Sequence, residues 1–166
     1  MRQDARGPLS RPINVERRSK DGAEIVVEAT PEECAALAAD FALPGIRDLV
    51  GRFRLRGTPA RLHVGGTVEA LVTQTCTVSL DPFETRLREA VDVDFTSGDD
   101  LPGVTIDDLE LPDPIVNGRI DLGALTAEFL ALGLDPYPRK PGIAFEPVLD
   151  EADKPLADLR KLRPDR

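Results

Sequence analysis

An alternation of apolar and charged side chains between Ile46 and Thr73 restricts the fold of this chain more than any other feature. Its clearest part places Phe53 and Leu55 in one phase and three arginines in the other, Arg52, Arg54 and Arg56. Successive side chains of a β-strand point to opposite faces, so this period of two predicts a strand with one buried face and one solvated, basic face. We refer to the three arginines as the arginine row.

The same pattern continues beyond the arginine row and predicts several consecutive strands. Apolar residues alternate from Leu62 to Val72 and recur from Leu87 to Phe95, and Gly65-Gly66 predicts a bulge or a tight turn. Nearer the N-terminus, residues 13–16 and 23–28 are predicted strands, and we expect them to form a hairpin. Strands joined by short turns favour an antiparallel meander, and the pattern leaves open whether the sheet closes toward a barrel.

Two helices are predicted by capping residues that precede apolar side chains at helical spacing. Thr30 is followed by Pro31 and, three residues past the cap, by Glu33, which indicates a capping box and a helix over residues 31–43. Asp121 is the predicted N-cap of a second helix, over residues 121–133.

The predicted fold class is therefore α+β, with an antiparallel sheet packed by two main helices. The sheet is built mainly from residues 10–28 and 46–95, and a chain of 166 residues fits one domain, residues 1–166. Residues 97–118, rich in acids and prolines, predict an extended acidic connection with little core of its own. A proline-rich segment follows the second helix.

The charge of the chain is unevenly distributed. The net charge of −9 opposes non-specific attachment to nucleic acid, and no DNA partner is expected. Residues 46–63 nevertheless carry five arginines and one acid, whereas residues 81–113 carry two arginines and eleven acids. The chain shows neither a secretory signal nor an apolar run of the ~20 residues that span a bilayer, so we expect a soluble, cytoplasmic protein without a membrane partner.

The residues that carry catalysis in other proteins are scarce here, and we expect no enzyme, no metal and no cofactor. The one histidine, His63, shares its strand phase with charged residues and is predicted to be a solvated strand-face side chain. Cys34 and Cys76 are predicted to be reduced core thiols, because two cysteines are too few for a disulfide framework. Two cysteines and one histidine also cannot complete a four-ligand zinc site. A low pKa for Cys76 is not expected, since the strand end supplies no evident cationic neighbour or helix N-terminus.

Two groups of residues are candidates for binding. The arginine row can contact phosphates from alternate strand positions about 6.6 Å apart, or it can pair across strands with acids such as Glu69 or Glu89. The segment Asp135–Gly142, which we call the strap, has two interpretations: it lies over the core with Tyr137 packed inward, or it presents three side chains for recognition, Tyr137, Arg139 and Lys140.

Three segments resemble the YceD family of bacterial large ribosomal RNA accumulation proteins. Residues 66–83, Gly-Thr-Val-Glu-Ala-Leu-Val-Thr-Gln-Thr-Cys-Thr-Val-Ser-Leu-Asp-Pro-Phe, are similar to the family's strand that leads into C-x-R-C-L-x-P-F. Residues 120–134 and the strap follow in the same order as in the family. Val78 and Ser79 depart from the pattern, since many relatives have arginine and a second cysteine there, so a shared metal or thiol role is in doubt for this chain.

The resemblance implies a cytoplasmic, non-enzymatic factor needed for normal accumulation of large-subunit ribosomal RNA. Such a factor acts by binding that RNA or a basic ribosomal protein, and the excess of acids slightly favours the protein or a mixed contact. The alternative is a structural or regulatory protein-interaction module outside ribosome assembly that shares only the fold.

Overall fold

The computed structural model describes residues 7–16, 22–58, 60–97 and 112–144. They form seven strands and two helices in the order β1 (Pro12–Asn14), β2 (Glu24–Glu28), α1 (Pro31–Asp40), β3 (Gly45–Thr58), β4 (Arg61–Thr75), β5 (Pro82–Thr96), β6 (Asp113–Pro114), β7 (Arg119–Asp121) and α2 (Leu122–Leu132).

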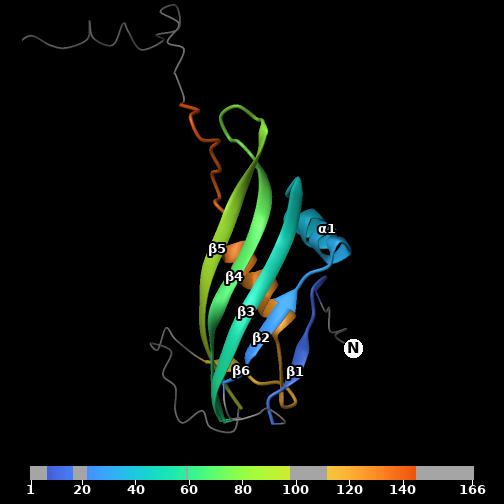
Figure 1. Cartoon of the computed structure of the whole chain (residues 1–166), viewed down its shortest axis with the longest axis vertical. Helices are drawn as coiled ribbons and strands as arrows, with labels where there is room; N and C mark the ends of the chain where they lie inside the picture. The colour runs from blue at the N-terminus through green and yellow to red at the C-terminus, as the bar shows by residue number, and fades with distance from the viewer. Residues whose placement is uncertain (1–6, 17–21, 59, 98–111, 145–166) are drawn as a thin grey trace, which may run out of the picture.

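The centre of the molecule is a five-stranded sheet in the order β2-β3-β4-β5-β6 (Figure 1). Strands β2 to β5 follow one another along the chain and pair antiparallel, whereas β6 joins β5 in parallel through two residues. The sheet is open, with β2 and β6 at its edges. The α+β class and the antiparallel meander are thus confirmed, and the sheet does not close into a barrel.

The predicted N-terminal hairpin is wrong. β1 pairs with β7 in a separate two-stranded sheet, in which Ile13 lies opposite Ile120, while β2 pairs with β3. Asp121 strengthens the distant pairing, because its carboxylate accepts hydrogen bonds from Ser10 Oγ and, at 2.7 Å, from the Arg11 amide. A local alternation of residues predicts that strands exist, but it carries no information on which distant partner they choose.

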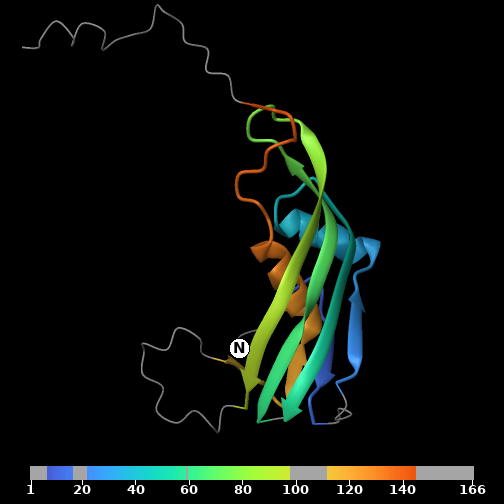
Figure 2. The ribbon, with the colours of Figure 1, turned by 60° about the vertical axis from the view of Figure 1, so that its left-hand side comes forward.

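The two faces of the main sheet differ as the alternation predicts. Phe53, Leu55 and Val64 are completely buried on the face that α2 covers, and Gly51 on the same face brings β3 close to Thr126 of α2. α1 packs against β3, with Cys34, Leu37 and Ala38 buried. Figure 2 shows α2 behind the sheet, and neither described helix covers the opposite face. We call that opposite side the open face.

Both helices start at the predicted caps. Thr30 accepts a hydrogen bond from the Glu33 amide at 3.2 Å, and the Glu33 carboxylate accepts from the Thr30 amide at 2.9 Å, which completes the capping box of α1. Asp121 caps α2 by accepting from the amides of Gly123 and Ala124. α1 ends at Asp40, three residues before the predicted end, because the C-cap Phe41 and then Ala42, with a φ of 53°, leave the helical conformation.

The predicted bulge or turn at Gly65-Gly66 is also wrong, because β4 runs straight through both residues. The irregularity lies in β3, where the register with β4 shifts between Arg47 and Val50. Gly66 is required by close approach of the neighbouring strand, since a Cβ there would lie 2.0 Å from the carbonyl oxygen of Arg52.

The predicted acidic connection is described only in part. Residues 98–111 lie outside the described part of the chain, so the prediction stays a prediction there. Residues 112–118 contain β6, and Val116 forms an isolated bridge with Arg119 just after them. The amide of Ile115 donates to the carbonyl of Thr96 at 2.8 Å.

Candidate functional site

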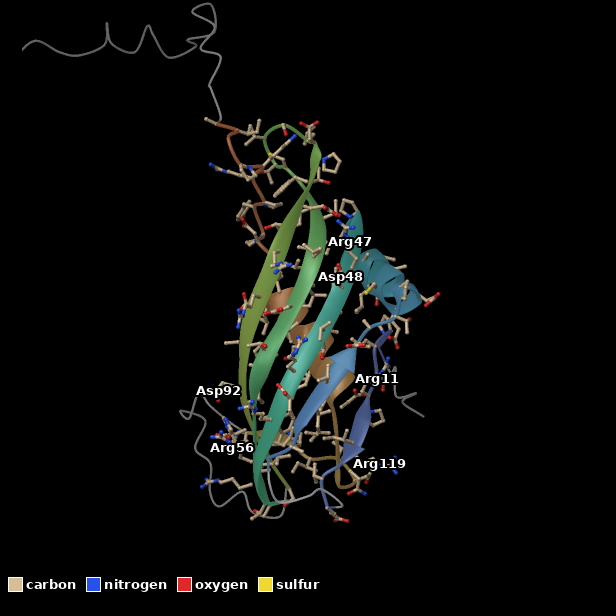
Figure 3. The ribbon with its side chains drawn as sticks, in the orientation of Figure 1. Arg11, Arg47, Asp48, Arg56, Asp92 and Arg119 are labelled. Atoms are coloured by element: carbon tan, nitrogen blue, oxygen red, sulfur yellow. The ribbon has the colours of Figure 1, made fainter. Side chains whose placement is uncertain are left out.

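The open face of the sheet displays the arginine row. All three of its side chains are exposed, on alternate positions of β3, while Phe53 and Leu55 between them are buried. The predicted solvated, basic face is therefore confirmed. Figure 3 shows Arg56 at the end of the sheet that also carries Asp92, and Arg47 and Asp48 near its other end.

Of the two interpretations of the arginine row, cross-strand pairing with Glu69 or Glu89 is wrong. Glu69 instead accepts from Arg88 of β5, with Nε and Oε1 3.2 Å apart. Glu89 lies on the opposite face, where its side chain reaches Gly133 at the end of α2. Within the described residues, no acid forms an ion pair with any member of the row, so its three charges are available to a partner.

A hollow of about 350 Å³ opens on the open face beside the arginine row. Its size falls within the range of small-molecule sites, roughly 300–1,000 Å³. The glycine at 65 leaves the space free, because its missing side chain would occupy the open face between β3 and β5. We call it the Gly65 hollow, and its lining residues are Glu24, Arg52, Arg54, Arg56, His63, Gly65, Gly66 and Thr67.

His63 stands between this hollow and two acids on β5. Its Nδ1 lies 3.0 Å from Asp94 Oδ1 and 3.6 Å from Asp92 Oδ1. Its Nε2 is turned the other way, since a Cβ on Gly65 would meet it at 3.2 Å. The side chain is 40% exposed, which confirms the predicted strand-face position. The acidic partners on β5 form a contact that sequence spacing alone did not reveal.

The strap lies at the other end of the sheet, against the turn between β4 and β5 (Figure 1). The carbonyl of Pro138 accepts from the Thr77 amide at 2.9 Å and from the Thr77 hydroxyl at 3.3 Å, and Gln74 Nε2 donates to the carbonyl of Asp135 at 3.1 Å. The strap interpretation is therefore correct for the backbone. Its second part is wrong, because Tyr137 is 74% exposed and does not pack inward.

Cys76 lies under the strap and has a different environment from the one predicted. The amide of Lys140 donates to its Sγ at 3.4 Å, and the amide of Ser79 donates at 3.5 Å. The Lys140 amide and then the hydroxyl and amide of Ser79 favour the thiolate and lower the pKa of Cys76 to about 6. Backbone donors thus replace the cationic neighbour that the sequence lacks. Cys76 is fully buried, as predicted for a core thiol.

The pKa of Cys34, on the buried side of α1, is shifted in the opposite direction. Burial raises the pKa of its thiol, because no comparable set of donors compensates for the lost hydration. The two predicted core thiols are therefore both buried, but only Cys76 is held in a site that favours negative charge.

The six candidate binding residues consequently divide into two groups. The arginine row pairs with His63, Gly65 and Thr67 in the first half of β4, whereas the strap, which carries Tyr137, Arg139 and Lys140, is bonded at Cys76 and Thr77 just beyond the other end of that strand. Gly65 and Thr75 are ten positions apart on β4, which corresponds to about 33 Å of strand. One compact ligand cannot contact both groups.

Two further features bear on the kind of partner. The described residues include no cluster of three or more histidine, cysteine or acidic side chains fit to hold a metal ion. Neither described helix has the length and apolarity needed to cross a bilayer.

Comparison with protein families supplies the relationship. The model described as "Large ribosomal RNA subunit accumulation protein YceD" matches residues 64–162, more than half of the chain. The chain belongs to the YceD family. Searches of curated proteins and of solved structures gave no match.

The matched part of this YceD family member contains most of β4, together with β5, α2, the Cys76 turn and the strap. β3 with the arginine row precedes the matched residues. The Gly65 hollow therefore contains residues from both parts of the chain. The arginine row and His63 precede the match, whereas Gly65, Gly66 and Thr67 lie at its beginning.

Proposed function

We propose that this protein supports accumulation of the large ribosomal subunit in the cytoplasm by binding large-subunit ribosomal RNA through its open face, without catalysis. The observation that carries the proposal is the arginine row, which has three exposed guanidinium groups and, within the described residues, no ion-pair partner. Guanidinium groups bind phosphate through paired hydrogen bonds, so an unengaged row on a sheet face suits an RNA backbone.

The local charge outweighs the net charge in this argument. The chain as a whole carries −9, which disfavours a diffuse approach to RNA. The row, however, concentrates three positive charges along about 13 Å of β3, and charges this close to a bound phosphate act over less than a Debye length. The net charge would restrict binding to this surface and disfavour unspecific contact elsewhere.

The open face also favours the RNA backbone over unstacked bases. Single-stranded RNA is held by aromatic side chains on which bases stack. The exposed phase of β3 to β5 has no Phe, Tyr or Trp in the described chain, and Phe53 and Phe95 point to the buried face. A folded or double-helical RNA, recognised by its phosphates, is the partner that fits.

The test is binding of the purified full chain to large-subunit RNA over a salt series. We expect affinity to fall steeply with salt, and the double variant Arg52→Gln/Arg54→Gln to reduce the slope of log affinity against log salt by about 1.4 to 1.8, the share of two phosphate contacts. The matched control is Arg47→Gln/Arg88→Gln, which removes the same charge from the same face but at arginines already paired with Glu84 and Glu69.

Equal losses in the two double variants would show that only total charge matters and would overturn the role of the row. Tight binding to basic large-subunit proteins together with indifference to RNA would overturn the RNA proposal and favour a chaperone that uses its acidic residues. Normal large-subunit levels in cells without the protein would place it outside ribosome assembly.

A further inference from the structure

The Gly65 hollow has the composition of an anion site within the larger open face. Two strands contribute donors: β3 supplies the arginine row and β4 the hydroxyl of Thr67. Glu24 of β2, opposite Arg54 in the register, is the one acid on its wall. Donors thus outnumber acids in a space that an anion has room to enter.

We propose that the Gly65 hollow is a phosphate-binding seat formed by the arginine row, with the ring of His63, held by Asp94, as its wall. The inference rests on the proposed RNA-binding function for its natural ligand and adds where one phosphate of that RNA is bound. The chemical class of the ligand is a phosphate group, and the row's length along the strand points to an internal phosphodiester whose neighbours contact the remaining arginines.

The ring of His63 forms one wall of the seat and is held in place by β5. The Asp94 carboxylate accepts a hydrogen bond from Nδ1 at 3.0 Å, so Nε2 faces the hollow beside Gly65. Arg56 is the register partner of His63 on β3, so this ring stands directly beside the arginine row.

The glycine makes the seat testable without a change of charge. Gly65 does not have a positive φ, and a Cβ there would come closest to the movable ring of His63, at 3.2 Å, with the backbone oxygen of Val91 at an ordinary contact distance of 3.9 Å. Gly65→Leu is therefore expected to fold and to fill the hollow. The matched control is Thr73→Leu, on the same face of the same strand about 26 Å away.

The experiment is a titration of the full chain with inorganic phosphate, followed by NMR of backbone amides and arginine Nε–H groups. We expect saturable changes at Gly65 and the arginine row, weakened about tenfold or more by Gly65→Leu, as for loss of a charged hydrogen bond. Thr73→Leu should bind as the wild type does. Unchanged affinity in Gly65→Leu, or equal changes at the paired Arg88, would overturn the seat.

A further arm identifies which phosphate of the RNA is bound. Gly65→Leu should weaken the binding of RNA with a 5′-hydroxyl as much as the binding of RNA with a 5′-phosphate. A loss of affinity confined to the 5′-phosphorylated RNA would overturn the assignment of the ligand to an internal phosphodiester.

The seat and the proposed function fail in different ways. Phosphate binding that Gly65→Leu abolishes, in a protein indifferent to ribosomal RNA, would sustain the seat and overturn the function. RNA binding that depends on Arg52 and Arg54 but not on the hollow would sustain the function and overturn the seat.

Discussion

The polar groups at the two ends of the main sheet differ in what they bind. At the Cys76 turn, the hydroxyl of Thr77, the amide of Gln74 and the thiol of Cys76 all bond to the strap. At the other end, the arginine row has no ion pair within the described residues, and the Gly65 hollow stands open beside it. The comparison suggests that one end is held together by its own contacts, while the other keeps its charges for a partner.

The largest expected effect is a loss of stability when Gly66 in the main sheet is replaced. Gly66→Ala places a Cβ 2.0 Å from the backbone oxygen of Arg52, so we expect a loss of about 3 kcal/mol or more in the free energy of unfolding. Gly65→Ala has its one close contact, 3.2 Å, with the side chain of His63 and should change this free energy by no more than about 1 kcal/mol. Urea unfolding of both variants measures the difference, and similar losses would show that the two glycines are equivalent.

The second expected effect is a pH dependence confined to the strap end. The folded pKa of Cys76, about 6, lies below that of an unfolded cysteine, about 8.5. The unfolded chain therefore holds more protons between these values, so stability should rise with pH across them and be lost as the pH falls through about 6. Cys76→Ser should lack this rise. Identical profiles for the two proteins would mean that no thiolate forms beneath the strap.

A smaller effect should follow from loosening the strap itself. Thr77→Val removes the hydroxyl that donates to Pro138 but keeps the amide, so we expect about 0.5–1 kcal/mol less stabilisation of the strap. The readout is the rate at which a thiol reagent modifies the buried Cys76, which should increase. The control is Thr75→Val, at the end of β4 two positions before Thr77. An equal increase in the modification rate of Cys76 in this control would argue against a specific role of the hydrogen bond from Thr77 to Pro138.

The smallest effect tests whether the row contributes to the fold at all. Arg54→Gln should alter the free energy of unfolding by less than about 0.5 kcal/mol, as expected of a surface change without a partner. Arg88→Gln breaks an exposed pair with Glu69 and should cost up to about 1 kcal/mol at low salt. A clearly larger loss for Arg54 than for Arg88 would mean that the row is structural.

Local patterns were sufficient to predict β1 to β5, both helices and the exposed arginines, but not the short strands β6 and β7. The alternation around Phe53 fixes which side chains are buried, and Thr30 and Asp121 mark helix starts through hydrogen bonds within three residues. The partner of β1, the Asp94 carboxylate beside His63 and the Lys140 amide beside Cys76 all come from residues more than 30 positions away. Spacing along a chain does not encode such contacts, and no pattern near Cys76 indicates that the Lys140 amide will reach it.

The hydrogen bonds of Asp121 have a consequence for how the protein forms during synthesis. Ser10 and Arg11 are separated from their partner by 111 and 110 positions, so they are made well before it. Contacts of such high sequence separation form late and slow folding, because a long loop must close before they are gained. β1 therefore has to wait until β7 has left the ribosome, so it stays unpaired with β7 while the whole main sheet between them is being made.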